Sequence, residues 1–540
     1  MVGEIIGHIG LDDFRSEDGV VYIYPEQGEE DALFRGQFIS IEVGNQRFFG
    51  QIINEPKNYP LSGQSSSAMN EYPILHQEKI QYVPAYKVVS KVKILGEVSN
   101  GLTLKSHFTR PRPASKVRLI NTDEARSLLN VSGKEVLGVI MGYEDEEKPI
   151  TITINDIMGR KQLGIFGMTG TGKSNTCLRI AEIFAELGWC VIFLDYLGEY
   201  PECKYASDES KLFNEQWKNL DVTPQGNKDV NVYLPISDTR EIEGAKKFTL
   251  KTKFMTQGII ISMFCRTEAQ KRDFIPILKK IPQEHLHLKT ISNELGIKIA
   301  DLSEAKSGSL TIVKNRIDNQ VEQTNRLFDN YETEFELADT KALDSFKKIG
   351  INVPQIETSD LDPDELLKEG RINIIDFKNS SSYDYAATTL VLLRRLYNLK
   401  KEHSESPNDY PKVMLMIEEA HIPFMESESN IFASSLNEIA RKVFKIGRHY
   451  YLNICAISQR PSDIPESIIS QINTRIIHRL KNSYDINKVI TGDIKEYSTS
   501  VPTLKTGEAI IDSADFITPL TVKIAPARSK KIDPFVVKAE

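Results

Sequence analysis

The sequence has little of what marks a secreted, zinc-binding or membrane protein. Its 540 residues include only five cysteines, an odd number at wide spacings, with no CxxC pair. These cysteines argue against a disulfide scaffold or a zinc site and favour a reduced, cytoplasmic protein. The start of the chain carries acidic residues and no long apolar core, so we expect no signal peptide. No stretch approaches the roughly 20 apolar residues of a membrane helix, and we expect no membrane contact.

An excess of basic residues is also missing. Lys and Arg total 67 against 75 Asp and Glu, which gives a net charge of −8. A protein that binds nucleic acid over its whole surface is usually basic. If this chain binds DNA, a local patch or a pore must supply the contact. The length leaves room for about three domains.

Residues 1–110 predict a small β-barrel. Short β-branched or aromatic runs recur there between Gly, Asn, Pro and Ser residues, with almost no helical periodicity. These runs are VVYIYP, GQFISIEV, QRFFGQII, YVPAYKVVSKVKILGEV and LTLKSHF. Residues 111–150, which begin with PRPAS and have the acidic YEDEEKP near their end, predict a connector.

From residue 151 the pattern changes to α/β. Apolar runs of strand length alternate with helical stretches, as a parallel sheet buried on both faces requires. The runs are LGIFG (163–167), CVIFLDY (190–196), INIIDF (372–377), VMLMIEE (413–419), LNICAIS (452–458) and TRIIHRL (474–480), and GEAIID (507–512) could add an edge strand. We expect one ATPase core in two parts, residues 151–240 and 366–525, with an extended tail at 526–540.

Residues 241–365 separate the two parts and predict a helical insertion. Val313, Ile317 and Val321 recur at i, i+4 and i+8, the spacing of one helix face. We interpret this apolar stripe as packing within a helix bundle.

Residues 167–174, GMTGTGKS, match the phosphate-loop pattern G-x-x-x-x-G-K-[ST] between a predicted strand and a predicted helix. Glycines let the backbone curl so that its N–H groups face a phosphate, and the helix N-terminus favours an anion. We expect Lys173 to contact the β- and γ-phosphates of ATP and Ser174 to bind Mg²⁺. The predicted nucleotide-binding residues are Gly167, Met168, Thr169, Gly170, Thr171, Gly172, Lys173, Ser174 and Asn175.

Acidic residues end two of the other predicted strands. Glu418 and Glu419 end VMLMIEE, where buried carboxylates are costly unless they hold a metal or polarise water. We assign Glu418 to the Mg²⁺ shell and Glu419 to orienting the attacking water, although the roles could be exchanged. Asp195 ends CVIFLDY and faces the same crevice in such a fold, where it is expected to support the water or the metal shell.

Together these elements resemble the HerA branch of the HerA/FtsK superfamily of ring-forming DNA translocases. The resemblance rests on GMTGTGKSNT, LDYLGEY, IEEAH and the block ARKVFKIGRHYYLNICAISQRPSDIPESIISQINTRIIHRL (440–480). It implies a RecA-like P-loop ATPase core preceded by the barrel that HerA proteins carry, with a helical insertion. It also implies a homohexamer with ATP bound between subunits and double-stranded DNA in the channel.

The resemblance also assigns residues to the site. Gln459 in SQRPS matches the polar residue that senses the γ-phosphate. Arg448 in IGRHY matches the arginine that reaches the neighbour's nucleotide, and Arg441 is the competing candidate. Arg160 in MGRK matches a second arginine at the subunit interface.

This chain departs from the family pattern at two places. The acidic pair is Glu-Glu, where Asp-Glu is commoner, and Tyr196-Leu197 replaces the Pro-His often seen before Gly-Glu-Tyr. No needed carboxylate is lost. The division of roles among Asp195, Glu199, Glu418 and Glu419 therefore stays open.

The chain has no nuclease constellation of its own. HerA proteins act with a separate effector, either the NurA nuclease in DNA end resection or, in bacterial antiphage systems, a nuclease or a sirtuin-like NAD-consuming enzyme. The N-terminal barrel is their usual docking surface. The composition lacks the ion-pair richness of a hyperthermophile, which favours a bacterial antiphage translocase or helicase. An ATPase scaffold that assembles and activates an effector, and HerA–NurA-type resection, are the alternatives.

Overall fold

The computed structural model comprises two compact units. The first contains Met1–Ile154, Thr491–Ser500 and Glu508–Ile524, and the second contains Asn155–Ile490, Val501–Gly507 and Ala525–Glu540. The structure describes residues 5–9, 20–25, 33–54, 57–60, 86–99, 103–106, 109–129, 131, 135–144, 149–155, 161–252, 255–282, 285–322, 328–329, 359–405, 409–426 and 432–532.

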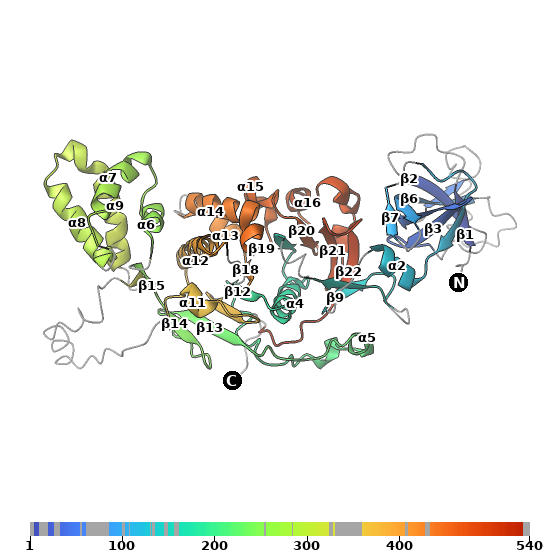
Figure 1. Ribbon diagram of the computed structural model, residues 1–540, viewed down its shortest axis with the longest axis horizontal. Helices are drawn as coiled ribbons and strands as arrows, with labels where there is room; N and C mark the ends of the chain where they lie inside the picture. Colours follow the sequence, from blue (N-terminus) through green and yellow to red (C-terminus); the bar gives the residue numbers. More distant parts are fainter. Residues whose placement is uncertain are drawn as a thin grey trace, which may run out of the picture. The chain divides into compact units, whose positions relative to one another are not determined.

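The first unit contains a closed six-stranded antiparallel barrel, blue in Figure 1, as the sequence predicts. Its strands follow the order β2-β1-β8-β3-β4-β6, and pairing between β6 and β2 closes the ring. Alternating apolar residues such as Ile39, Ile41 and Val92 fill the interior. The strands are β1 (Ile5–Ile9), β2 (Val20–Pro25), β3 (Phe38–Val43), β4 (Gln46–Ile52), β6 (Tyr86–Ser99) and β8 (Lys116–Leu119), and β5 (Lys57–Pro60) and β7 (Thr103–Lys105) pair with β6.

The segment 111–150, predicted as a connector, is an integral part of this unit. It supplies the barrel strand β8, the helix α2 (Thr122–Leu129) and the strand β9 (Glu135–Ile140). Strand β9 pairs with β10 (Thr151–Ile154) and with β22 (Leu520–Ile524), which in turn pairs with β21 (Glu508–Ser513). The run KVRL in β8 is only four residues long, too short to stand out as a strand in the sequence.

The second unit is built on a parallel sheet with the order β20-β11-β19-β18-β12-β17-β13-β14. Every residue of β12, β17, β18 and β19 is buried, which explains their unbroken apolar runs. The bounds are β11 (Leu163–Phe166), β12 (Cys190–Asp195), β13 (Val230–Pro235), β14 (Lys246–Phe248), β17 (Ile372–Asp376), β18 (Val413–Ile417), β19 (Leu452–Ser458) and β20 (Thr474–Ile477). The sequence predicts all of these except β13 and β14.

Helices cover this sheet and connect its strands. The helix after the phosphate loop, α4 (Lys173–Glu186), packs on β11 and β12, and α14 (Ala433–Ile446) packs on β19. The other helices are α5 (Glu215–Asn219), α11 (Pro363–Leu366), α12 (Ser382–Glu402), α13 (His421–Phe424), α15 (Glu466–Ile469) and α16 (Ser483–Val489). The RecA-like α/β class predicted from the sequence is confirmed.

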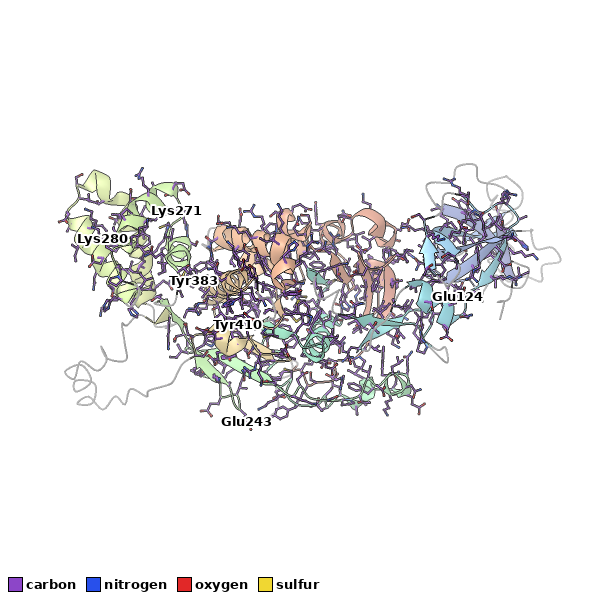
Figure 2. All side chains as sticks on the ribbon, viewed as in Figure 1. Glu124, Glu243, Lys271, Lys280, Tyr383 and Tyr410 are labelled. Atoms are coloured by element: carbon purple, nitrogen blue, oxygen red, sulfur yellow. The ribbon has the colours of Figure 1, made fainter. Side chains whose placement is uncertain are left out.

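The predicted helical insertion is also present, in green in Figure 1. It contains α6 (Gln257–Phe264), α7 (Glu268–Leu278), α8 (Leu288–Ala300) and α9 (Glu304–Glu322), next to the short pair β15 (Leu250–Lys251) and β16 (Phe328–Asp329). Val313 and Ile317 of the predicted stripe are fully buried, so the stripe is bundle packing. The segment Arg266–Lys280, which carries five Lys and Arg residues, contains α7, and Figure 2 shows Lys271 and Lys280 on this bundle.

Candidate functional site

Four strands of the second unit bring the predicted site residues to one edge of the sheet. The phosphate loop follows β11, Asp195 ends β12, Glu418 and Glu419 follow β18, and Gln459 follows β19. These strands are parallel, so their carboxyl ends share an edge. This is the edge at which ligands bind in open α/β sheets.

The phosphate loop needs its glycines. Gly170 and Gly172 have φ of +75° and +101°, a conformation that favours glycine. A Cβ on Gly167 would lie 2.6 Å from the Cβ of His478. The helix α4 then starts at Lys173 without a side-chain cap. Its first-turn N–H groups have no acceptor within the helix, so the loop and the helix start form an anion site.

Lys173 and Glu419 form a buried ion pair, with 3.4 Å between Nζ and Oε1. The Gln459 side-chain amide also donates to Glu419, and Thr169 Oγ1 donates to Gln459 Oε1 at 2.7 Å. His421 Nδ1 lies 3.2 Å from the second Glu419 oxygen. Side-chain contacts thus connect the phosphate loop with Glu419 after β18 and Gln459 after β19.

The backbone of Glu419 is strained, with a φ of +44° that non-glycine residues rarely adopt. Burial would raise the pKa of its carboxyl, but the hydrogen bond from His421 and the charge of Lys173 outweigh burial and lower the pKa to about 2. Glu419 is therefore ionised at neutral pH, as a group that accepts a proton from water must be.

Glu418 has the opposite environment. Its Oε2 accepts backbone hydrogen bonds from Tyr196 at 3.0 Å and Leu197 at 3.2 Å, and the Tyr200 hydroxyl lies 3.4 Å from Oε1. Complete burial raises its pKa to about 7, although Lys173 opposes the shift. Lys173 stays charged, because burial lowers its pKa but Glu419 and Glu418 together raise it further.

The Asp195 carboxylate accepts its hydrogen bonds from the turn that follows it. It accepts backbone hydrogen bonds from Gly198 at 2.7 Å, Glu199 at 3.1 Å and Tyr200 at 3.0 Å. Burial and the neighbouring Glu418 raise its pKa. This geometry favours shaping of the turn over support of the water or the metal shell, the roles expected from the sequence. That turn brings Glu199 into the site, where its Oε2 is buried without a hydrogen-bond partner among the described residues.

Ser174 and Asn175, at the end of the phosphate loop, have different surroundings. The Ser174 side chain is partly buried at the start of α4, next to Lys173. Asn175 instead binds the C-terminal segment, donating to Ala525 O at 2.9 Å and accepting from Ala527 N at 2.8 Å. The segment expected as an extended tail is therefore held against α4 as far as Ser529, whose N donates to Glu182 at 2.8 Å. Further on, Ile532 N donates to Glu199 O at 2.7 Å.

Arg448 lies at the other edge of the sheet. It belongs to the turn Gly447–Tyr450, which precedes β19, whereas Gln459 follows the same strand. Seven strand residues separate the two edges, about 20 Å at the usual rise per residue. Arg448 is exposed and lines a polar hollow with Lys445 and Gln162. Arg441 is also exposed, on α14, and its Nε donates to Asn437 O at 3.0 Å. Arg160 lies outside the described residues.

Two contacts of this site had no predicted role. His421 contacts the Glu419 carboxylate and, at 3.1 Å, Ser458 Oγ. Its position two residues after Glu419 in IEEAH is the signal that could have placed it there. Thr506 donates to Gly170 O at 3.0 Å, and its segment VPTLKTG contains no known motif.

The residues present fit a nucleoside triphosphate with Mg²⁺. The glycine loop and helix start supply N–H donors, and Lys173 supplies a cation. Glu199 adds a carboxylate oxygen with no hydrogen-bond partner among the described residues. Mg²⁺ typically takes one or two carboxylates together with substrate phosphates. The fold and the site define a P-loop NTPase with a RecA-like core.

Comparison with known proteins refines this class. The family profile described as "Helicase HerA, central domain" matches residues 136–396, and "Helicase HerA-like C-terminal" matches residues 351–523. The DNA double-strand break repair helicase HerA of Saccharolobus solfataricus is 24% identical over 507 residues, 91% of this chain and 87% of that protein. The protein of the same name from Pyrococcus furiosus is 24% identical over 460 residues, 81% of this chain and 77% of that protein.

Among solved structures, the bacterial conjugative coupling protein TrwBdeltaN70 is similar over 77% of this chain and 96% of that chain, with 12% identity and a TM-score of 0.48. The two HerA profiles together span residues 136–523. This chain belongs to the HerA helicase family, and it is an ATP-dependent enzyme of the helicase and translocase class. In the part of the chain that the structure describes, no helix has the length and apolarity to cross a membrane.

Proposed function

We propose that this protein is a hexameric ATPase that moves along double-stranded DNA and works with a separate effector enzyme. The observation that carries the proposal is the placement of Arg448. The lysine, carboxylates and glutamine of one site share one sheet edge, and this arginine lies at the opposite edge of the same sheet.

The residues at the first edge perform the hydrolysis. Lys173 leaves Glu419 to contact the β- and γ-phosphates of ATP, which frees that carboxylate to orient the attacking water and accept its proton. Gln459 contacts both Glu419 and Thr169, so it can report the state of the γ-phosphate to the loop. When bound, Mg²⁺ neutralises charge on the phosphates, with Ser174 and Glu418 or Glu199 as its protein ligands.

The arginine at the second edge completes a neighbouring site. With about 20 Å of sheet between it and its own loop, Arg448 cannot reach its own nucleotide while its turn stays at the start of β19. In a ring, a heterologous head-to-tail interface brings this edge of one subunit to the loop of the next. The guanidinium then stabilises charge on the transferring phosphoryl group, so hydrolysis requires the ring. Arg160 is proposed for the same interface.

The effector is proposed to dock on the N-terminal barrel. The first unit has its own apolar core, which contains none of the residues predicted to bind nucleotide. The effector would be a nuclease or a sirtuin-like NAD-consuming enzyme, in antiphage defence. DNA end resection with a NurA-type nuclease is the second candidate, favoured by the name of the curated relatives, which are called DNA double-strand break repair helicases.

ATP turnover with and without linear duplex DNA tests the proposal, with Glu419→Gln as the matched inactive variant. A translocase predicts turnover that rises several-fold with DNA and is lost in the variant. Robust turnover that DNA does not change would contradict translocation and favour the scaffold alternative. Turnover that survives Glu419→Gln would contradict the site itself.

A further inference from the structure

Thr506 and Gly507, which lie much later in the chain, donate hydrogen bonds to the phosphate loop. Thr506 Oγ1 donates to Gly170 O at 3.0 Å, and Gly507 N donates to Thr171 O at 3.0 Å. Thr506 follows Gly170 by 336 positions in the sequence. Loop and segment belong to the same compact unit.

The contact favours glycine on both sides, at position 172 because of the close approach and at position 507 because of its backbone angle. A Cβ on Gly172 would lie 3.0 Å from Gly507 N and 3.2 Å from Gly507 Cα. Gly507 itself has a φ of +85°. Any side chain at position 172 would push the segment away, and any side chain at 507 would be strained.

These contacts determine where the loop's N–H groups point. In a planar trans peptide the C=O and the following N–H point in opposite directions. Because Gly170 O faces Thr506, the Thr171 N–H faces away from it, and because Thr171 O faces Gly507, the Gly172 N–H faces away as well. A third bond, from Thr171 Oγ1 to Met168 O at 2.7 Å, stabilises the curl.

We infer that Thr506 and Gly507 form a clamp that holds the phosphate loop in its nucleotide-binding conformation, with Thr506 as a positioning residue for ATP. The inference rests on the proposed function, because it assumes that this loop binds ATP. The clamp orients two amides before ATP arrives, so less conformational freedom is lost on binding. Among the described residues, no hydrogen bond or ion pair joins Thr506 to Lys173, Glu419 or Gln459, so we expect the clamp to act on nucleotide affinity more than on the chemical step.

The test compares Thr506→Val with Thr506→Ser in the full-length protein. Valine keeps the shape of threonine and removes the donor, and serine keeps the donor. A single exposed hydrogen bond is worth about 1 kcal/mol, so the KM for ATP should rise about threefold to tenfold in Thr506→Val, and kcat should change less. Thr506→Ser should restore KM to near the wild-type value, with both variants unfolding at the wild-type temperature.

Equal KM for Thr506→Val and wild type would overturn the clamp and leave the proposed function intact. An equal rise in KM for both variants would also overturn it, because the donor would then be irrelevant. A wild-type protein that neither binds nor hydrolyses ATP would overturn the proposed function and the clamp together.

Discussion

The two edges of the parallel sheet in the second unit differ in how their polar residues are held. At the carboxyl edge, the buried Glu419 carboxylate contacts buried Lys173 and the partly buried Gln459 and His421. At the amino edge, Arg448 is exposed and lines a hollow beside another cation, Lys445. A buried ionic group is costly unless it is paired, whereas an exposed arginine is available to an outside partner. One edge thus holds most of the predicted hydrolytic residues, and the other presents the exposed arginine that we propose for a neighbouring site.

Removing the charge of Glu419 at the carboxyl edge should have the largest effect on ATP hydrolysis. Glutamine at position 419 keeps the shape of the side chain but cannot take a proton from water. We expect Glu419→Gln to lower kcat for ATP hydrolysis by about a hundredfold to ten-thousandfold, measured by phosphate release at saturating ATP. Turnover within a few-fold of wild type would mean that another group, with Glu418 the nearest candidate, accepts the proton.

Removing the arginine at the amino edge should have an effect of similar or smaller size. An arginine finger contributes about a thousandfold or more to kcat, so Arg448→Ala should lose most turnover while ATP still binds. Arg441→Ala is the matched control on the same surface region, and it should stay within a few-fold of wild type. The opposite ranking of the two variants would assign the finger to Arg441.

The contribution of Glu418 to stability should depend on pH, and this effect is smaller. Glu418 has its pKa raised from 4.5 to about 7 by burial, so between these values the folded protein holds a proton that the unfolded chain has released. This carboxyl therefore destabilises the fold as pH rises through that range. In Mg²⁺-free buffer, the melting temperature of Glu418→Gln relative to wild type should rise by roughly a few degrees from pH 5 to pH 8. A difference that does not change with pH would contradict the raised pKa.

The sequence predicts the strands of the carboxyl edge well because each is a buried apolar run that ends in a functional residue. It does not predict their order. Strand β11 lies between β19 and β20, which follow it by nearly 300 residues, and no local pattern encodes such pairing. Strand β13 begins with two partly buried residues, and β14 has three residues with one buried, so their patterns are weak.

The chemistry of the site was predictable by residue type but not by orientation. The loop, Glu419 and Gln459 meet as their motifs indicate. Asp195 looks like a second catalytic acid in sequence, yet three backbone N–H groups occupy its carboxylate. Asn175 looks like part of the loop, yet it faces the C-terminal segment. Such single contacts depend on which way one side chain turns, which spacing does not specify.

Mixing two inactive variants tests most directly whether the two edges act in different subunits. Lys173→Ala lacks a working loop but keeps Arg448, and Arg448→Ala keeps its loop but lacks the arginine. Co-assembled rings should regain ATP turnover, because roughly a quarter of the interfaces in a random one-to-one mixture would pair an intact loop with an intact arginine. Turnover no higher than that of the separate variants would contradict a site shared between subunits.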